Sequence, residues 1–213
     1  DYLFFTGDLV NNFGRETDGW FDVLRQLEAK NGMMSILGNH DYGDYSQWDK
    51  PEHKEENFLE VQEANREIGF DLLMNEHRIL ERNGQRIAVI GVENWGKPPF
   101  HQYGDLTKAA EGLDDDIPFR ILLSHDPSHW DMQVLGKISI DLTLSGHTHG
   151  AQFGVEAGSF KWSPVQYKYP RWAGLYKEGN QYLYVNRGFG FLGFPGRVGM
   201  PPEITVIELR NTV

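Results

Sequence analysis

Four short stretches of this chain indicate its fold: Thr6-Gly7-Asp8, Gly38-Asn39-His40-Asp41, Ser124-His125-Asp126 and Gly146-His147-Thr148-His149. Each one follows a short apolar run that is typical of a β-strand. Together they place one carboxylate, one amide oxygen and four imidazoles at the ends of strands, where α/β sheets present their chemistry. Oxygen and imidazole donors suit divalent transition metals. The stretches therefore predict an α/β fold with a metal site at one edge of its sheets.

The rest of the chain alternates strand-like and helix-like segments, which indicates a layered α/β core. Apolar runs bounded by glycine or polar turns predict strands at Tyr2–Thr6, Met33–Leu37, Arg86–Val92, Arg120–Ser124, Asp141–Leu144, Tyr182–Asn186 and Glu203–Leu209. Helical spacing predicts helices within Asp18–Lys30, Glu55–Ile68, Asp105–Glu111 and Ser128–Leu135. No helix separates the last two strands, so we expect them to pair antiparallel and the sheet to be mixed. No linker divides the chain, so we expect one domain over residues 1–213.

Composition and charge narrow the classes of function. The chain has 213 residues, a net charge of −11 and no cysteine. The negative charge argues against a protein that binds nucleic acid through its phosphates, so we expect no nucleic-acid partner. The lack of cysteine excludes thiolate catalysis and cysteine-based zinc sites. A phosphorylated small molecule remains compatible, because metal cations would attract it locally.

Each motif alone has an ordinary explanation. Gly7-Asp8 is common turn chemistry, Asn39-His40-Asp41 fits a plain turn, and Asp126 before Pro127 fits a helix cap. His147 and His149 project from one face of an extended segment, but such a pair is by itself weak evidence for a metal. Four coincidences at four strand ends are a stronger signal. The set as a whole therefore favours a metal site.

The order GD, GNHD, H and GHTH resembles the calcineurin-like metallophosphoesterase superfamily. The segments GDLV, LGNHDYG, LLSHDP, LSGHTHG and VNRGFG, with the closing PPEITVIEL, are similar to its YkuE-like branch of bacterial phosphoesterases. This resemblance implies a sandwich of mixed sheets flanked by helices. It also implies two divalent ions, of Mn, Fe or Zn. In that scheme Asp8 bridges the ions, Asn39, His125 and His147 complete the second site, and His149 belongs to the first.

The family also carries an earlier D-x-H motif, which this sequence lacks. The first metal site then keeps only Asp8 and His149. We therefore expect the natural protein to be longer at its N-terminus, with an apolar gap about one strand wide, ~4.7–4.9 Å, in the truncated chain. Relatives are often tethered to membranes by such a segment, so the resemblance also implies a membrane-associated bacterial parent.

The resemblance implies hydrolysis of a phosphomonoester or phosphodiester by a metal-activated hydroxide. His40 would donate a proton to the leaving alcohol, and Asp41 would orient its ring. One alternative is an inactive or single-metal fragment, a pseudoenzyme that binds a phosphorylated ligand. Another is a nucleotide- or lipid-binding module without turnover.

The segment after residue 150 is rich in glycine and aromatic residues. Gly188–Gly193 fits a dinucleotide-binding pattern, but no helix follows, so we expect a glycine-rich loop instead. Its flanking residues Arg187 and Arg197 are candidate ligands for a substrate phosphate. The aromatic stretch Phe153–Phe194 is either a cover for the sheet or an apolar wall for a phospholipid-like or aromatic substrate. The remaining histidines, His53, His77, His101 and His129, are expected to play surface or hydrogen-bonding roles.

Overall fold

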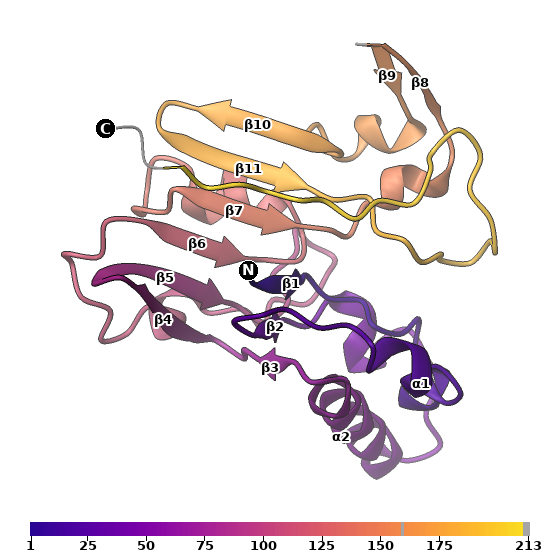
Figure 1. Cartoon of the computed structure of the whole chain (residues 1–213). Helices are drawn as coiled ribbons and strands as arrows, with labels where there is room; N and C mark the ends of the chain where they lie inside the picture. Colours follow the sequence, from indigo (N-terminus) through magenta and orange to yellow (C-terminus); the bar gives the residue numbers. More distant parts are fainter. Residues whose placement is uncertain (159, 211–213) are drawn as a thin grey trace.

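The computed structural model describes residues 1–158 and 160–210. Two sheets pack face to face, with helices on their outer faces (Figure 1). The larger sheet has six strands in the order β10-β11-β7-β6-β5-β4. Its inner four strands run parallel, and the two edge strands are antiparallel to their neighbours. The bounds are β4 Glu76–Arg82, β5 Gln85–Gly91, β6 Arg120–Leu123, β7 Leu142–Ser145, β10 Gly174–Glu178 and β11 Gln181–Val185.

The smaller sheet is parallel, in the order β1-β2-β3. Its strands are β1 Leu3–Phe5, β2 Met33–Ser35 and β3 Asp71–Leu72. Helix α2, Pro51–Ile68, covers its outer face and buries Val61 against Leu37 and Leu72. A separate hairpin joins β8, Val155–Ala157, to β9, Phe160–Trp162.

Successive side chains along the strands of the large sheet point to opposite faces, so the sheet has a hydrophobic core on each face. Val89, Ile121 and Leu123 face the small sheet and pack against Met34 and Ile36. Side chains next to them in sequence point to the opposite face, as the pleat requires. That second core holds Ala88, Ile90, Val92, Leu106, Ala109, Ile117, Leu122, Trp130, Val134, Ile140, Leu183 and Val185. The expected sandwich of mixed sheets flanked by helices is confirmed.

The helices differ from expectation mainly at their ends. Helix α2 begins at Pro51, four residues before the predicted start, because proline fits the first helical turn. Helix α1 covers only Phe21–Leu24 of the predicted 18–30. Its side chain Val23 stays 57 % exposed, and an isolated short helix without a buried face is marginal. The third and fourth predicted helices shorten to α3, Leu106–Ala109, and a π-helical turn, Trp130–Val134.

The predicted strand over residues 203–209 is wrong. This segment is extended but pairs with no strand in the described part of the chain, and Ile204 and Val206 are 83 % and 93 % exposed. A strand needs a hydrogen-bonding neighbour, which extended sequence alone cannot supply. Strand β11 instead pairs antiparallel with β10, which the sequence analysis missed. Figure 1 shows the C-terminal segment running back along β11, where Thr205 accepts a hydrogen bond from Asn186.

Strand β1 lies at the edge of the small sheet and pairs with β2. The strand expected to precede it stays a prediction. Among the described residues, no helix has the length and apolar character needed to cross a bilayer.

Candidate metal centre

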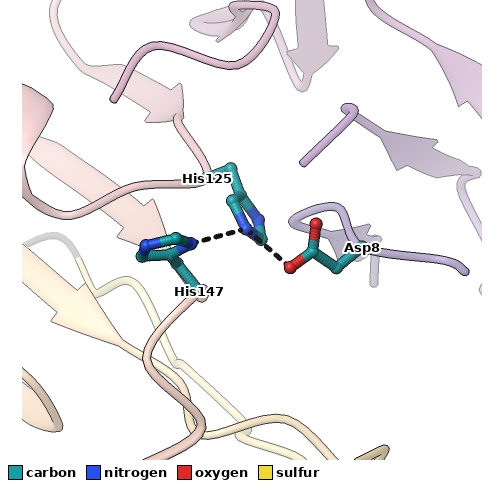
Figure 2. A group of neighbouring side chains, drawn as sticks. All are labelled: Asp8, His125 and His147. Atoms are coloured by element: carbon teal, nitrogen blue, oxygen red, sulfur yellow. Dashed lines mark hydrogen bonds and ion pairs between the residues drawn. The ribbon is translucent and has the colours of Figure 1, made fainter. Parts of the chain in front are cut away.

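Asp8, His125 and His147 converge at the carboxyl ends of strands from both sheets (Figure 2). His125 Nε2 lies 3.0 Å from Asp8 Oδ2 and 3.2 Å from His147 Nδ1. One ligand atom from each residue lies within 4.8 Å of the others. The three side chains therefore surround a volume that one divalent ion could occupy, as the sequence analysis predicted for these residues.

The backbone at this centre adopts unusual conformations. Asp8, His147 and His149 have φ angles of 59°, 69° and 51°, in the left-handed region that side chains disfavour. Strain of this kind concentrates at functional sites because surrounding contacts hold it. These turns bring the side chains of Asp8 and His147 to the cluster with His125.

Two glycines allow the turns at this centre to approach each other closely. A Cβ on Gly38 would lie 2.2 Å from Asp8 Oδ1 and 2.6 Å from His125 Cε1. A Cβ on Gly7 would lie 2.3 Å from the Gly38 nitrogen. The close approach of the turns after β1 and β2 thus depends on these two glycines.

Two further predicted ligands lie nearby and hold unpaired polar atoms. Asn39 is 4 % exposed; its Nδ2 donates to the Tyr45 hydroxyl at 3.0 Å, but its buried Oδ1 has no hydrogen-bond partner in the described chain. Nδ1 of His149 is also buried without a partner there. Buried acceptors are normally satisfied, so the unpaired Oδ1 of Asn39 fits a role as a metal ligand. The residues present thus fit a divalent ion, with His149 beside the three-residue cluster rather than within it.

Charge at the cluster is shared between Asp8 and His125. Burial alone would lower the pKa of His125, but the Asp8 carboxylate raises it to about 9. The cationic His125 in turn holds the pKa of Asp8 well below its usual range, against burial. Burial and the neighbouring His125 lower the pKa of His147. A divalent cation bound by His125 would replace this proton, since a ligating imidazole must be neutral.

Asp41 has a different role from the predicted one. Its buried carboxylate accepts hydrogen bonds from four backbone amides, those of Asp8, Leu9, Val10 and Gly38, at 2.8–3.3 Å. Burial and the Asp8 charge raise the pKa of Asp41 to about 7, while the amides favour the ionised form. The 3₁₀ turn Asn39–Tyr42 points successive side chains in different directions. Asp41 therefore fixes the Asp8 turn and does not hold the His40 ring.

His40 is held by a backbone carbonyl. Its Nδ1 lies 2.7 Å from the carbonyl oxygen of Asn11, and its ring packs against Tyr45 at 4.8 Å between centroids. Its backbone nitrogen donates to Asp8 Oδ1 at 3.0 Å. With Nδ1 donating to the carbonyl, Nε2 is the nitrogen available to a substrate.

The sequence analysis missed the outer partners of the ligands. His125 Nδ1 donates to the Thr6 carbonyl at 2.6 Å, and His147 Nε2 lies 2.7 Å from the Tyr169 hydroxyl. Such partners fix the orientation of ligating imidazoles. Tyr169 stands in the aromatic stretch after residue 150, where no local pattern marks it. The buried Asp126 has one oxygen without a partner in the described chain, 3.6 Å from His147 Nε2.

The two predicted phosphate-binding arginines are engaged inside the protein. Arg187 pairs with Glu203 and Glu156, each at 2.7 Å. Arg197 donates to the carbonyls of Gly190, at 2.8 Å, and of Arg187, at 2.9 Å. Both hold the glycine-rich loop 188–199 in place, and their binding of phosphate stays a prediction.

Among the other histidines, His129 is buried and has a hydrogen-bonding role, as expected. Its Nδ1 lies 2.7 Å from Ser124 Oγ, and its ring stacks on Trp95. His77 Nδ1 bonds the Ala109 carbonyl at 2.9 Å.

Comparison with known proteins points to one family. Residues 1–151 match the family model for calcineurin-like phosphoesterases. The whole chain is 30 % identical to YkuE, a metallophosphoesterase of Bacillus subtilis, and spans 68 % of that protein. It is also 30 % identical to the phosphodiesterase YaeI of Escherichia coli, with 98 % of this chain and 67 % of that protein covered.

Solved structures share the fold at lower identity. The sulfate thiohydrolase SoxB of Thermus thermophilus aligns over 86 % of this chain with a TM-score of 0.50 and 16 % identity. The chain spans 33 % of that larger protein, so the match supports the fold alone.

Proposed function

Since this chain belongs to the calcineurin-like phosphoesterase family of metal-dependent phosphoric ester hydrolases, we propose that it hydrolyses a small phosphomonoester or phosphodiester at the Asp8 cluster. The proposal includes two metal ions and His40 as the general acid. The convergence of Asp8, His125 and His147 is the observation that carries it. Bound divalent ions would neutralise charge on the phosphoryl oxygens and lower the pKa of a water.

The ligands divide into two groups. Asp8, His125 and His147 would hold one ion, since one donor atom of each lies within 4.8 Å of the others, and the buried, unpaired Oδ1 of Asn39 would be a fourth ligand. Asp8 and His149 would contribute to a second. The outer bonds from Thr6 and Tyr169 keep the imidazoles aimed at that volume before any ion enters.

His40 would supply the proton that the leaving alcohol needs. The Asn11 carbonyl fixes one ring nitrogen, so the ring has a set orientation and Nε2 is free to act on the substrate. Asp41 would act indirectly, by fixing the backbone from which both Asp8 and the 39–42 turn present their side chains.

Metal content and hydrolysis test the proposal together. Mn²⁺-loaded protein should contain about two ions per chain and hydrolyse p-nitrophenyl phosphate or bis-p-nitrophenyl phosphate. Asp8→Asn should abolish turnover, whereas Asp22→Asn, an exposed carboxylate on α1, should leave it unchanged. One ion per chain without turnover would instead identify a single-metal binding domain.

Leaving-group dependence tests the role of His40. p-Nitrophenolate departs without a proton, whereas an alkyl alcohol needs one. His40→Ala should therefore slow hydrolysis of an alkyl phosphate about 10²–10⁴-fold and that of the p-nitrophenyl ester much less. His53→Ala, on the exposed face of α2, is the matched control. Equal losses with both leaving groups would assign His40 a binding role instead.

A further inference from the structure

A cavity of about 220 Å³ opens directly beside the metal centre. Its lining includes His147 and His149. It also includes the apolar side chains Phe153, Leu192, Phe194 and Val198. The same hollow thus joins the candidate metal ligands to an apolar wall.

The apolar wall consists of these four side chains, Phe153, Leu192, Phe194 and Val198, and they are 41–60 % exposed. A single exposed apolar residue is ordinary on a protein surface. Four that converge on one cavity beside polar ligands are typical of a binding site. Filling the cavity with hydrocarbon would remove this surface from water, which is favourable in proportion to the area covered.

A polar scaffold behind the wall holds it in place. The Gln152 side-chain amide donates to the carbonyls of Phe194, at 2.7 Å, and Gly196, at 2.8 Å. The backbone carbonyl of Gln152 accepts a hydrogen bond from the Val198 nitrogen at 2.7 Å, and the Arg197 side chain donates one to the Gly190 carbonyl. The loop is therefore fixed by its backbone, while its apolar side chains are left facing the cavity.

Apart from the two histidines, the polar side chains that line the cavity already have hydrogen-bond partners. Thr148 Oγ1 donates to the Trp172 carbonyl at 2.7 Å. Both ends of the Gln152 amide bond the loop backbone, since its Oε1 accepts from the Leu192 nitrogen. Recognition of a nucleobase needs free donors and acceptors that pair with its edge. The cavity suits a group that has no hydrogen-bonding atoms.

We propose that the apolar wall binds a single hydrocarbon chain attached to the substrate's phosphate. The substrate class would be alkyl or acyl-chain phosphoesters, with the phosphate at His147 and His149 and the chain against the wall. A volume of about 220 Å³ is below the ~300–1,000 Å³ of pockets that enclose a whole drug-sized ligand, so the cavity accommodates one chain and not two. This inference rests on the proposed function for the position of the phosphate.

Alkylphosphonates, which cannot be hydrolysed, test the inference by binding alone. Calorimetry on the Mn²⁺-loaded chain would compare methyl-, butyl- and hexylphosphonate. Each methylene buried against the wall should tighten binding about two- to fourfold, so hexylphosphonate should bind at least about 30-fold more tightly than methylphosphonate. The phosphonate analogue of dihexanoyl phosphatidic acid, which has two chains and also resists hydrolysis, should gain nothing over hexylphosphonate.

Variants locate the effect on the wall. Phe194→Ser and Leu192→Ser should each flatten the dependence of affinity on chain length. Phe191→Ser is the matched control, because that residue is in the same loop, is 50 % exposed and does not line the cavity. The midpoint temperature of thermal unfolding should be unchanged in all three variants, since these side chains are exposed.

The possible failures are distinct. Equal affinity for the three phosphonates, or a chain-length effect that survives both wall variants, would overturn the inference. Much tighter binding of the two-chain lipid would contradict the single-chain limit. Absence of p-nitrophenyl ester hydrolysis alongside a normal chain-length series would instead count against the proposed hydrolysis, and the apolar subsite would stand.

Discussion

The substitution Asp41→Asn should destabilise the protein more than its similar shape suggests. The carboxylate is fully buried and accepts four backbone amides, two on each oxygen. An asparagine offers one oxygen, so two amide donors would face its NH₂ group. Each buried donor left unpaired costs about 1–3 kcal/mol. The loss should therefore be about 2–6 kcal/mol, a large part of the ~5–15 kcal/mol that stabilises a typical domain.

Asp126→Asn provides the matched comparison. Asp126 is buried to the same extent, but one of its oxygens accepts the Ser128 amide at 2.7 Å, and the other has no hydrogen-bond partner among the described residues and lies 3.6 Å from His147 Nε2. The same substitution there removes a buried charge and leaves no amide unpaired. The cost should be within about 1 kcal/mol, since the single hydrogen bond can be kept by the asparagine oxygen.

Urea unfolding followed by circular dichroism would measure both variants. Chelator should be present, so that metal binding does not contribute, and the pH should be about 8.5, above the pKa of about 7 of Asp41. Equal unfolding free energies for the two variants, at unchanged m, would refute the assignment of Asp41 as the anchor of the Asp8 turn.

Three further outcomes follow from single contacts. Burial lowers the pKa of His129 to about 4, so the neutral ring gains a proton on unfolding, and about 3 kcal/mol of stability should be lost as the pH falls from about 6.5 to about 4. His129→Gln should make that slope shallower in urea titrations at several pH values; an unchanged slope would contradict the assignment. Gly38→Ala should cost about 1–3 kcal/mol and disturb metal binding, because its Cβ would lie 2.2 Å from a carboxylate oxygen, whereas Gly190→Ala meets no atom within 4 Å and should be neutral. Tyr169→Phe removes the hydroxyl 2.7 Å from His147 Nε2 and should weaken Mn²⁺ binding about 10–100-fold by calorimetry, with unaltered affinity counting against a positioning role.

The strands that precede the candidate ligands were predicted from the sequence with nearly correct bounds. Runs such as Arg120–Leu123 and Leu142–Ser145 form strands where the apolar pattern places them. Parallel strands bring their carboxyl ends to one edge, so the turns after them, with His125 and His147, meet there. The ends of helices were harder to predict from the sequence. The pattern predicted a helix over residues 18–30, but only Phe21–Leu24 is helical, and this helix has no buried residue that packing would stabilise.

The partners of the site residues could not be predicted. Proximity in sequence suggested that Asp41 holds His40, but the ring bonds Asn11, 29 residues away. Tyr169, 22 residues from His147, had no motif around it. Hydrogen bonds of this kind depend on how turns are oriented after packing, and the sequence pattern carries no record of that orientation.

The sequence by itself determined the ligand types, their place at strand ends and the layered α/β class, because these depend on local periodicity and on side-chain chemistry. The tertiary structure alone decided that residues 203–209 join no strand of the described chain, that Asp41 anchors the Asp8 turn, and that an apolar cavity adjoins the candidate ligands. Those features depend on which backbone groups and surfaces come to lie opposite one another, and only the packed chain sets that.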